Sequence, residues 1–233
     1  MDKENLFKTY LYIGEDKFSI SVKKNDESRK FYENQILVDN FQNKKENYSL
    51  DNFLDENIFK IEKLTNSFIK DIYIIIDNND FLNIEVSIRN KNYGNKVDLN
   101  KLKYSFGDIK NEVEENNQDK ELIHMIINRY MLDNNSYLLI PKNIKCEHLF
   151  LEILFICLSK KLIKQLETTL SKYQIKVEKI ISAKYIKSIF KEDEDIFKMC
   201  ELILQGFNAN EIVLIPKIEK NKGFFEKFFN LFS

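Results

Sequence analysis

The side chains best suited to catalysis or metal binding are few in this chain of 233 residues, which has two histidines and three cysteines. Neither His124 nor His148 has a serine or cysteine at the spacing of a nucleophile and its base. A histidine-rich metal site is excluded because there is no third histidine. We therefore expect His124 to be a hydrogen-bonded strand residue without a catalytic role. The sequence also lacks G-x-S-x-G, P-loop and dinucleotide-binding signatures.

The cysteines and the overall composition point to an ordinary intracellular protein. Cys146, Cys157 and Cys200 are scattered and form no metal pair, which predicts reduced thiols in the cytoplasm. A hydrophobic fraction of 43% allows a core, and a net charge of −1 implies no strong attraction to nucleic acid. The polar N-terminus predicts no signal peptide, and no apolar run approaches the ~20 residues of a membrane-spanning helix.

An acidic segment, Asp77-Asn78-Asn79-Asp80, follows the apolar run Ile74-Ile75-Ile76. A calcium ion there would need further oxygen ligands from elsewhere in the fold. A turn between two strands explains the segment better, because Asn and Asp are common turn residues.

The elements that would position these residues follow from hydrophobic periodicity. In the first third we expect strands at 9–13, 17–23, 31–38 and 71–76, and a helix that begins at Ser49 or Asp51. Next we expect a half-buried strand at 81–89, a polar loop at 91–100 and a short helix at 106–115. The central stretch, 121–190, predicts strand, strand, helix, strand, helix, and its second strand, 148–157, has the apolar character of a strand buried on both faces. After it, we expect a helix at 195–205 that ends at Gly206 and an extended segment at 211–218.

The central stretch resembles the bacterial cell-division family FtsA. The first strand of the family has the form hhHhIPxxYxhD, where h is apolar, and His124, Tyr130 and Asp133 match it. Ile127-Asn128 replaces the Ile-Pro of the family. The later matches are Val177, Ala183 and Glu192-Asp193-Glu194, so the resemblance is firmest over residues 121–194.

The resemblance implies an α/β (α+β) fold: an actin-like (ribonuclease H-like) lobe formed by residues 1–80 and 158–210. Residues 81–157 would form the inserted strand–helix–strand–strand subdomain of the FtsA type, which contacts neighbouring subunits and division proteins in that family. Residues 211–222 would be a linker and 223–233 a membrane-targeting helix. The second phosphate hairpin of the family and the lobe that grips FtsZ have no counterpart in the sequence.

The resemblance also identifies a degenerate phosphate turn, Gly14-Glu15-Asp16-Lys17. In the family, this hairpin has the form hxIGTxK and cradles nucleotide phosphates with backbone N–H groups and a hydroxyl. Here Glu15 occupies the hydroxyl position, and each of two carboxylates would repel a triphosphate by ~1–4 kcal/mol, of which Lys17 offsets a part. A polar turn without a ligand is therefore favoured, and we expect no enzyme activity, no cofactor and no metal.

The last residues, 223–233, form an amphipathic helix when they are placed on a helical wheel. Its apolar face consists of Phe224, Phe225, Phe228, Phe229, Leu231 and Phe232. Lysines lie just upstream at 217, 220 and 222, which favours binding to anionic inner membrane. The alternative is a helix that docks on the protein's own core.

From the resemblance we expect a peripheral adaptor of the division apparatus at the cytoplasmic face of the inner membrane, at midcell. Its partners would be anionic lipid, division proteins including FtsZ, and further copies of itself, but not nucleic acid. An actin-like platform protein of pilus or secretion assembly is the alternative. A residual ATP-binding protein is the third hypothesis.

Overall fold

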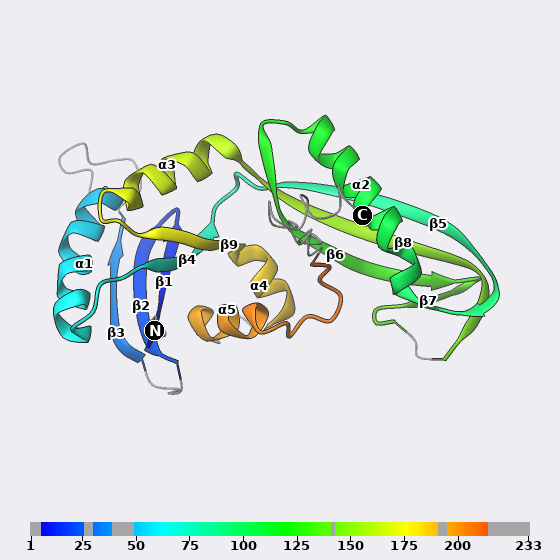
Figure 1. The fold of residues 1–233 in the computed structure, drawn as a ribbon, viewed down its shortest axis with the longest axis horizontal. Coiled ribbons are helices and arrows are strands. Elements are labelled where there is room, and N and C mark those ends of the chain that lie inside the picture. The colour runs from blue at the N-terminus through cyan, green and yellow to red at the C-terminus, as the bar shows by residue number, and fades with distance from the viewer. Residues whose placement is uncertain (1–5, 26–29, 39–48, 141–142, 191–194, 214–233) are drawn as a thin grey trace, which may run out of the picture.

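The computed structural model describes residues 6–25, 30–38, 49–140, 143–190 and 195–213, which form two β-sheets with helices packed on them (Figure 1). One sheet has five strands in the order β3-β2-β1-β4-β9. Strands β1, β4 and β9 are parallel, whereas β2 and β3 are antiparallel to their neighbours. This mixed α/β arrangement is that of an actin-like (ribonuclease H-like) lobe, which confirms the predicted fold class.

The five-stranded sheet is covered by helices on both faces. Its strands are β1 (Phe7–Gly14), β2 (Lys17–Lys24), β3 (Lys30–Leu37), β4 (Asp71–Asp77) and β9 (Lys176–Ser182). One face packs against α1 (Leu50–Thr65) and α3 (Lys160–Ser171). The other packs against α4 (Ala183–Ile189) and α5 (Ile196–Leu204).

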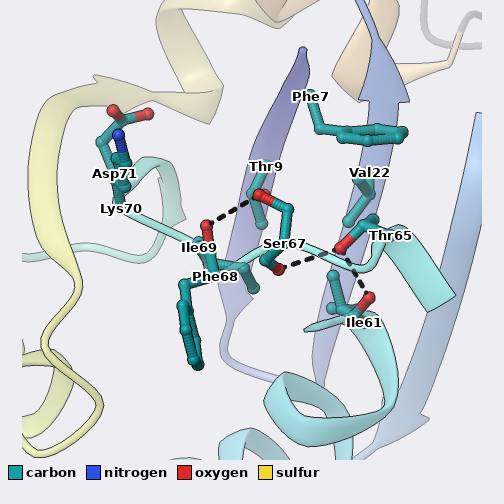
Figure 2. A pocket seen from close by; sticks show the side chains of 10 residues that line it. All are labelled: Phe7, Thr9, Val22, Ile61, Thr65, Ser67, Phe68, Ile69, Lys70 and Asp71. Atoms are coloured by element: carbon teal, nitrogen blue, oxygen red, sulfur yellow. Dashed lines mark hydrogen bonds between the residues drawn. The ribbon is translucent and has the colours of Figure 1, made fainter. Parts of the chain in front are cut away.

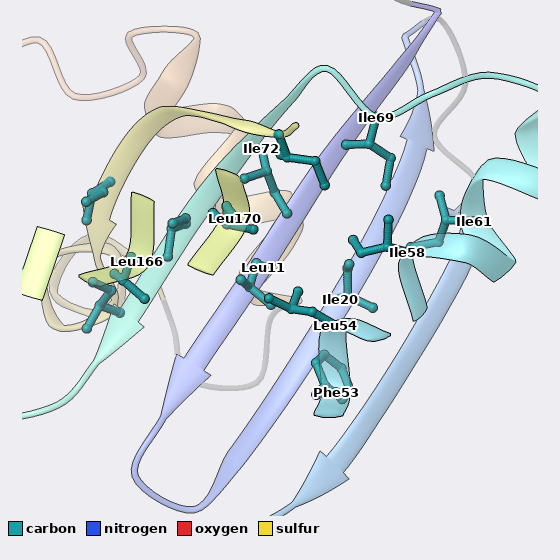
Figure 3. Packing of buried hydrophobic residues seen from close by; sticks show 14 of the residues in the cluster. Leu11, Ile20, Phe53, Leu54, Ile58, Ile61, Ile69, Ile72, Leu166 and Leu170 are labelled. Atoms are coloured by element: carbon teal, nitrogen blue, oxygen red, sulfur yellow. The ribbon is translucent and has the colours of Figure 1, made fainter. Parts of the chain in front are cut away.

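The core under α1 and α3 is built from fully buried aliphatic side chains. Leu11 and Ile20 of the sheet meet Leu54 of α1 there (Figure 3). Burial of one such side chain contributes roughly 1.5–3 kcal/mol. Helix α1 begins where the Ser49 hydroxyl accepts a hydrogen bond from the Asn52 N–H, as predicted for a cap at Ser49.

The connection from α1 to β4 is a tight turn. Asn66 adopts a left-handed conformation with φ 51°, and the Thr65 hydroxyl lies 2.9 Å from the Ile61 carbonyl and 3.0 Å from the Ser67 carbonyl (Figure 2). The cavity beside this turn has a volume of about 10 Å³. One water needs ~10–15 Å³, so this is a packing gap and not a ligand site.

The second sheet is the insert, with four strands in the order β5-β8-β6-β7. Its elements are β5 (Leu82–Lys96), the 3₁₀ turn Leu99–Leu102, α2 (Lys103–Asn116), β6 (Lys120–Leu132), β7 (Asn135–Tyr137) and β8 (Lys145–Ser159). One face packs against α2. The opposite face is buried near the lobe, at Ile126 and Ile156. Farther from the lobe it is exposed or half-buried, and we call this part, which includes Arg89, Phe150 and Glu152, the open face.

Two sequence expectations about the insert were wrong in detail, and one strand was missed. The polar loop predicted at 91–100 is strand as far as Lys96, because a bulge at Tyr93 (φ 51°) and Gly94 (φ 65°) lets pairing resume at Asn95. The short strand β7 was not predicted. Strand β8 is buried on both faces only at residues 155–158, since the rest of its second face lies on the open face.

The C-terminal predictions fall largely outside the described residues. Helix α5 lies where a helix was expected, and its last turn runs into Gly206 with φ 82°. Residues 214–222 of the predicted linker, the whole of the predicted helix 223–233 and the acidic match 192–194 are outside the described residues. Within the described part of the chain, no helix has the length and apolar character needed to cross a membrane.

Candidate functional site

The carboxyl ends of three parallel strands meet at one edge of the five-stranded sheet. Gly14 of β1 lies opposite Asp77 of β4, and Ile76 lies opposite Ser182 of β9. Open α/β sheets commonly bind ligands outside the carboxyl ends of their strands. This edge contains the degenerate phosphate turn, and we call residues 12–17, 77–80 and 182–187 the carboxyl edge.

Asp77 is the central acceptor of the carboxyl edge. Its Oδ2 accepts a hydrogen bond from the Tyr12 hydroxyl at 2.5 Å and another from the Lys187 Nζ at 2.6 Å. Burial alone would raise the pKa of Asp77, but the hydrogen bonds from Lys187 and Tyr12 outweigh it and hold that pKa below its ordinary value. Burial, together with the hydrogen bond to Asp77, raises the pKa of Tyr12. The result is an ionised aspartate bound to a neutral tyrosine and a lysine.

Gly14 is explained by its neighbour Tyr12. A Cβ atom at position 14 would lie 2.9 Å from Cε1 of Tyr12 and 3.2 Å from its hydroxyl, closer than side chains tolerate. A larger residue at position 14 would therefore require the Tyr12 ring to shift. The resemblance to FtsA assigned the glycine to phosphate binding, but packing against Tyr12 already favours it.

Several other polar groups of the carboxyl edge are also partnered. The Asn79 amide donates to Glu15 Oε1 at 2.9 Å and accepts from the Lys184 Nζ at 2.6 Å. The Lys17 Nζ lies 5.1 Å from the centre of the Tyr12 ring, within cation–π range. Asn78 bonds to Asp80, so the acidic segment is the turn that was predicted.

This arrangement gives an incoming phosphate little to bind. Lys187 and Lys184 already contact Asp77 and Asn79, and a triphosphate would meet the Glu15 and Asp16 carboxylates at the turn. Within the described ranges, no three His, Cys, Asp or Glu side chains are grouped to hold a metal ion. The turn residues Gly14, Glu15, Asp16 and Lys17 thus lie together at the strand ends in a network of internal contacts.

A second polar cluster lies where the lobe meets the insert. His124 of β6 is fully buried, and its Nδ1 is 2.9 Å from Glu211 Oε1. The Ser182 N–H donates to His124 Nε2, so Nε2 carries no proton and Nδ1–H donates to the carboxylate. Glu211 also accepts from the Tyr185 hydroxyl at 2.9 Å. His124 is therefore the satisfied strand residue that the sequence predicted.

The chain after α5 completes the insert by pairing with the free side of β6. The Ile127 N–H donates to the Asn210 carbonyl at 3.0 Å, and the Ile212 N–H donates to the Met125 carbonyl at 2.8 Å. This segment, 208–212, positions Glu211 against His124. Hydrogen bonds therefore join the lobe, the insert and the C-terminal segment at this one place, which we call the junction.

A groove of about 380 Å³ lies beside this junction. It is bounded by α4, the insert and the 208–212 segment. Its floor is apolar, with Ile126, Leu154 and Ile156 of the insert and Ile189 of α4. Polar side chains and one exposed leucine surround it: Asn83, Asn128, Leu138, Lys184, Ser188, Asn208 and Asn210. An apolar floor with a polar rim is the usual make-up of a binding groove.

Sequence reasoning did not find the groove or the partners of Asp77. Tyr12 and Lys187 are 65 and 110 positions from Asp77, and nothing in their local sequence marks them. Glu211 lies 87 positions from His124, so it too was assigned only to an extended segment. The predicted membrane-binding residues, Phe224, Phe225, Phe228, Phe229, Leu231 and Phe232, are outside the described residues.

The fold defines a class, the actin-like lobe with an inserted subdomain. No protein-family model and no curated protein sequence matches this chain. Among solved structures, it is similar to the cytoplasmic domain of EpsL, an inner-membrane component of the type II secretion system of Vibrio cholerae, at 7% identity and a TM-score of 0.39, over 80% of this chain and 60% of EpsL.

Two further solved structures are similar in fold. The PilM–PilN type IV pilus biogenesis complex matches at 8% identity and a TM-score of 0.45, over 78% of this chain and 49% of that one. A Bacteroides thetaiotaomicron protein of unknown function with an actin-like ATPase fold matches at 15% identity and a TM-score of 0.32, over 81% and 58%. The chain thus spans only about half to three fifths of these neighbours, and the fold assignment rests on strand order.

Proposed function

We propose that this chain is a non-catalytic, actin-like adaptor that binds a protein partner of a membrane-associated assembly. The observation that carries the proposal is the carboxyl edge, where Tyr12 and Lys187 are committed to Asp77 and where Glu15 and Asp16 repel phosphate. A site arranged in this way favours an internal structural role over nucleotide binding.

In this proposal the junction groove is the docking site. Its apolar floor suits an extended segment with apolar side chains at alternate positions, and the Asn83 and Asn128 side chains at its rim can bond the backbone of such a segment. The elements around it are fastened by the Glu211–His124–Tyr185 cluster, so little ordering entropy would be lost on binding.

We propose a pilus or secretion assembly as the setting, which is the setting of PilM and EpsL. Cell division is the second candidate, supported by the resemblance of residues 121–194 to FtsA, and FtsZ would then be among the partners to look for. A residual ATP-binding protein is the third, and the carboxyl edge argues against it.

We also propose that residues 223–233 hold the adaptor on anionic membrane at the cytoplasmic face. Burial of one Phe contributes ~1.5–3 kcal/mol, and each nearby lysine adds about 1 kcal/mol on anionic lipid. Phe228→Glu would place a charge in the apolar face and should abolish pelleting with anionic vesicles. Ser233→Glu, on the polar face, should pellet like the parent chain, and equal pelleting of all three proteins would refute membrane binding by this segment.

The docking proposal is tested by a matched pair of leucine variants. Leu138 lines the groove and is 76% exposed, whereas its neighbour Leu139 is 64% exposed and does not line it. Both can therefore be changed to glutamate without disturbing the core. We expect Leu138→Glu to lose the partner proteins that cross-link to the parent chain in cells, and Leu139→Glu to retain them.

Mass spectrometry of the cross-linked proteins then identifies the setting. Pilus or secretion components lost specifically from Leu138→Glu would support the first setting, and division proteins lost in the same way would support the second. Identical partner profiles for the parent and Leu138→Glu would contradict docking in the groove.

A further inference from the structure

Strand β5 is an edge strand of the insert. In the sheet order β5-β8-β6-β7, it hydrogen-bonds to β8 on one side, and within the described residues no strand pairs with its other side. In Figure 1 it runs the length of the insert along the border of the sheet. The outward N–H and C=O groups of such a strand can pair with another chain.

The two halves of β5 differ in how they resist such pairing. From Lys91 onward the strand has a lysine, a register shift and the left-handed pair Tyr93 and Gly94, which are devices that protect edges. From Leu82 to Asn90 the register with β8 is unbroken. This regular half contains no proline, lysine or bulge, so it remains available for pairing.

Beside this half of β5, a groove adjoins the apolar core of the insert. It has a volume of about 220 Å³ and is lined by apolar side chains of the strand (Ile84, Val86) and of α2 (Ile109, Val113), with polar residues of the helix end beside them (Glu112, Asn116, Asn117). Ile84 and Val86 are half-buried here, although both belong to the cluster that packs under α2. A strand added to the edge of β5 would place its own apolar side chains in this groove.

We infer that the strand added to β5 is β5 of a second copy of this chain, antiparallel and related by a two-fold axis through Ser87. In this register Glu85 of each copy faces Arg89 of the other on the open face, which gives opposite charges at both positions. Val86 of each copy faces Ile88 of the other on the α2 face. From Glu85 to Arg89 the sequence of β5 is therefore complementary to itself in both charge and hydrophobicity, and beyond it Ile84 faces Asn90.

The neighbouring symmetric register is less favourable. Centred on Ile88, it would pair Glu85 with Lys91, the last residue before the register shift. It would leave Ile88 against Ile88 as the one apolar pair on the α2 face between residues 85 and 91, whereas the Ser87-centred register has two such pairs. Asn90 faces an apolar side chain in both registers, Val86 or Ile84.

Charge exchange tests the interface and its register in the full-length chain. All proteins would carry Phe228→Glu so that residues 223–233 do not contribute to association. Glu85→Arg and Arg89→Glu each create two like-charge pairs, and we expect each to weaken dimerisation about 10- to 100-fold in sedimentation velocity. An equimolar mixture of the two should recover the affinity, because every facing pair is then opposite in charge. Lys91→Glu should dimerise like the parent.

A monomeric parent at all concentrations, or a mixture no tighter than either single variant, would overturn the inference. If Lys91→Glu lost as much dimer affinity as Glu85→Arg, the Ser87-centred register would be overturned.

A cysteine placed on the two-fold axis gives an independent test. Directly opposed residues have Cβ atoms ~4.5–5.5 Å apart, close to disulfide geometry, and the native Cys146, Cys157 and Cys200 are buried. Ser87→Cys should form a disulfide-linked dimer on mild oxidation. Asn83→Cys, exposed on the same face but far from its own copy, should not. Equal cross-linking of the two would contradict the proposed pairing.

Discussion

The five-stranded and four-stranded sheets of this molecule differ in how completely they are covered. The lobe sheet has helices on both faces, and its carboxyl edge is occupied by its own side chains. The insert has one helix on one face, an open second face and an exposed edge strand. Because binding needs accessible surface, this difference places stability mainly in the lobe and recognition mainly in the insert.

The largest expected effect comes from the lobe core. Ile74 of β4 is fully buried under α1 and α3, and Ile74→Ala should lower the free energy of unfolding by about 2–5 kcal/mol, since it removes methyl groups and leaves a cavity. Phe150→Ala, on the open face of the insert, should cost at most about 1 kcal/mol. Urea unfolding measures both. Equal losses of unfolding free energy in the two variants would contradict the claim that stability lies mainly in the lobe.

A smaller effect should separate the charged groups of the two regions. Asp77→Ala leaves the Tyr12 hydroxyl and Lys187 without their acceptor and should cost about 1–3 kcal/mol. Glu152, paired with Arg129 at 3.0 Å on the open face, is 37% exposed, so Glu152→Ala should cost about 0–1 kcal/mol. The carboxyl edge would not be a structural network if Asp77→Ala unfolded at the parent's urea midpoint.

The smallest effect concerns the junction between the two regions and depends on pH. Burial lowers the pKa of His124 despite the opposing hydrogen bond to Glu211. In the unfolded chain His124 binds a proton near pH 6.5, but the folded protein disfavours that proton, so unfolding free energy should fall as the pH drops below about 6.5. The slope from this group is at most about 1.4 kcal/mol per pH unit.

The pH dependence can be assigned with His124→Asn. An asparagine can still donate to Glu211 but does not titrate. The variant should be less stable than the parent at pH 8, because it loses the bond from the Ser182 N–H, and its stability should change less between pH 7 and 5. Parallel pH profiles for the two proteins, measured by urea unfolding, would show that another group is responsible.

The sequence was sufficient for most of the fold because its elements have strong periodicity. The β1–β2 hairpin, α1 and the order of β6, β8, α3, β9 and α4 follow from apolar spacing, and the structure contains them. The continuation of β5 past Tyr93 and Gly94 was missed because a bulge has the composition of a loop. Strand β7, with 3 residues, is too short to have a periodic pattern.

The candidate site was less predictable, for a physical reason. The Gly14 turn and the acidic segment at Asp77 could be located, since turns are encoded locally. Their partners depend on which strands and helices meet in the folded chain, and the junction groove is made from residues of six separate segments. Residues 82–90 alternate polar and apolar side chains as any half-buried strand does, so the exposed edge of β5 could be found only from the sheet order.

The most direct test of the central claim is calorimetric titration of magnesium-ATP into the full-length chain. We expect no binding heat up to millimolar nucleotide, because Lys187 and Lys184 are engaged by Asp77 and Asn79 and the turn presents Glu15 and Asp16. Micromolar binding that is lost in Asp77→Ala would contradict it and would make this chain a nucleotide-binding protein.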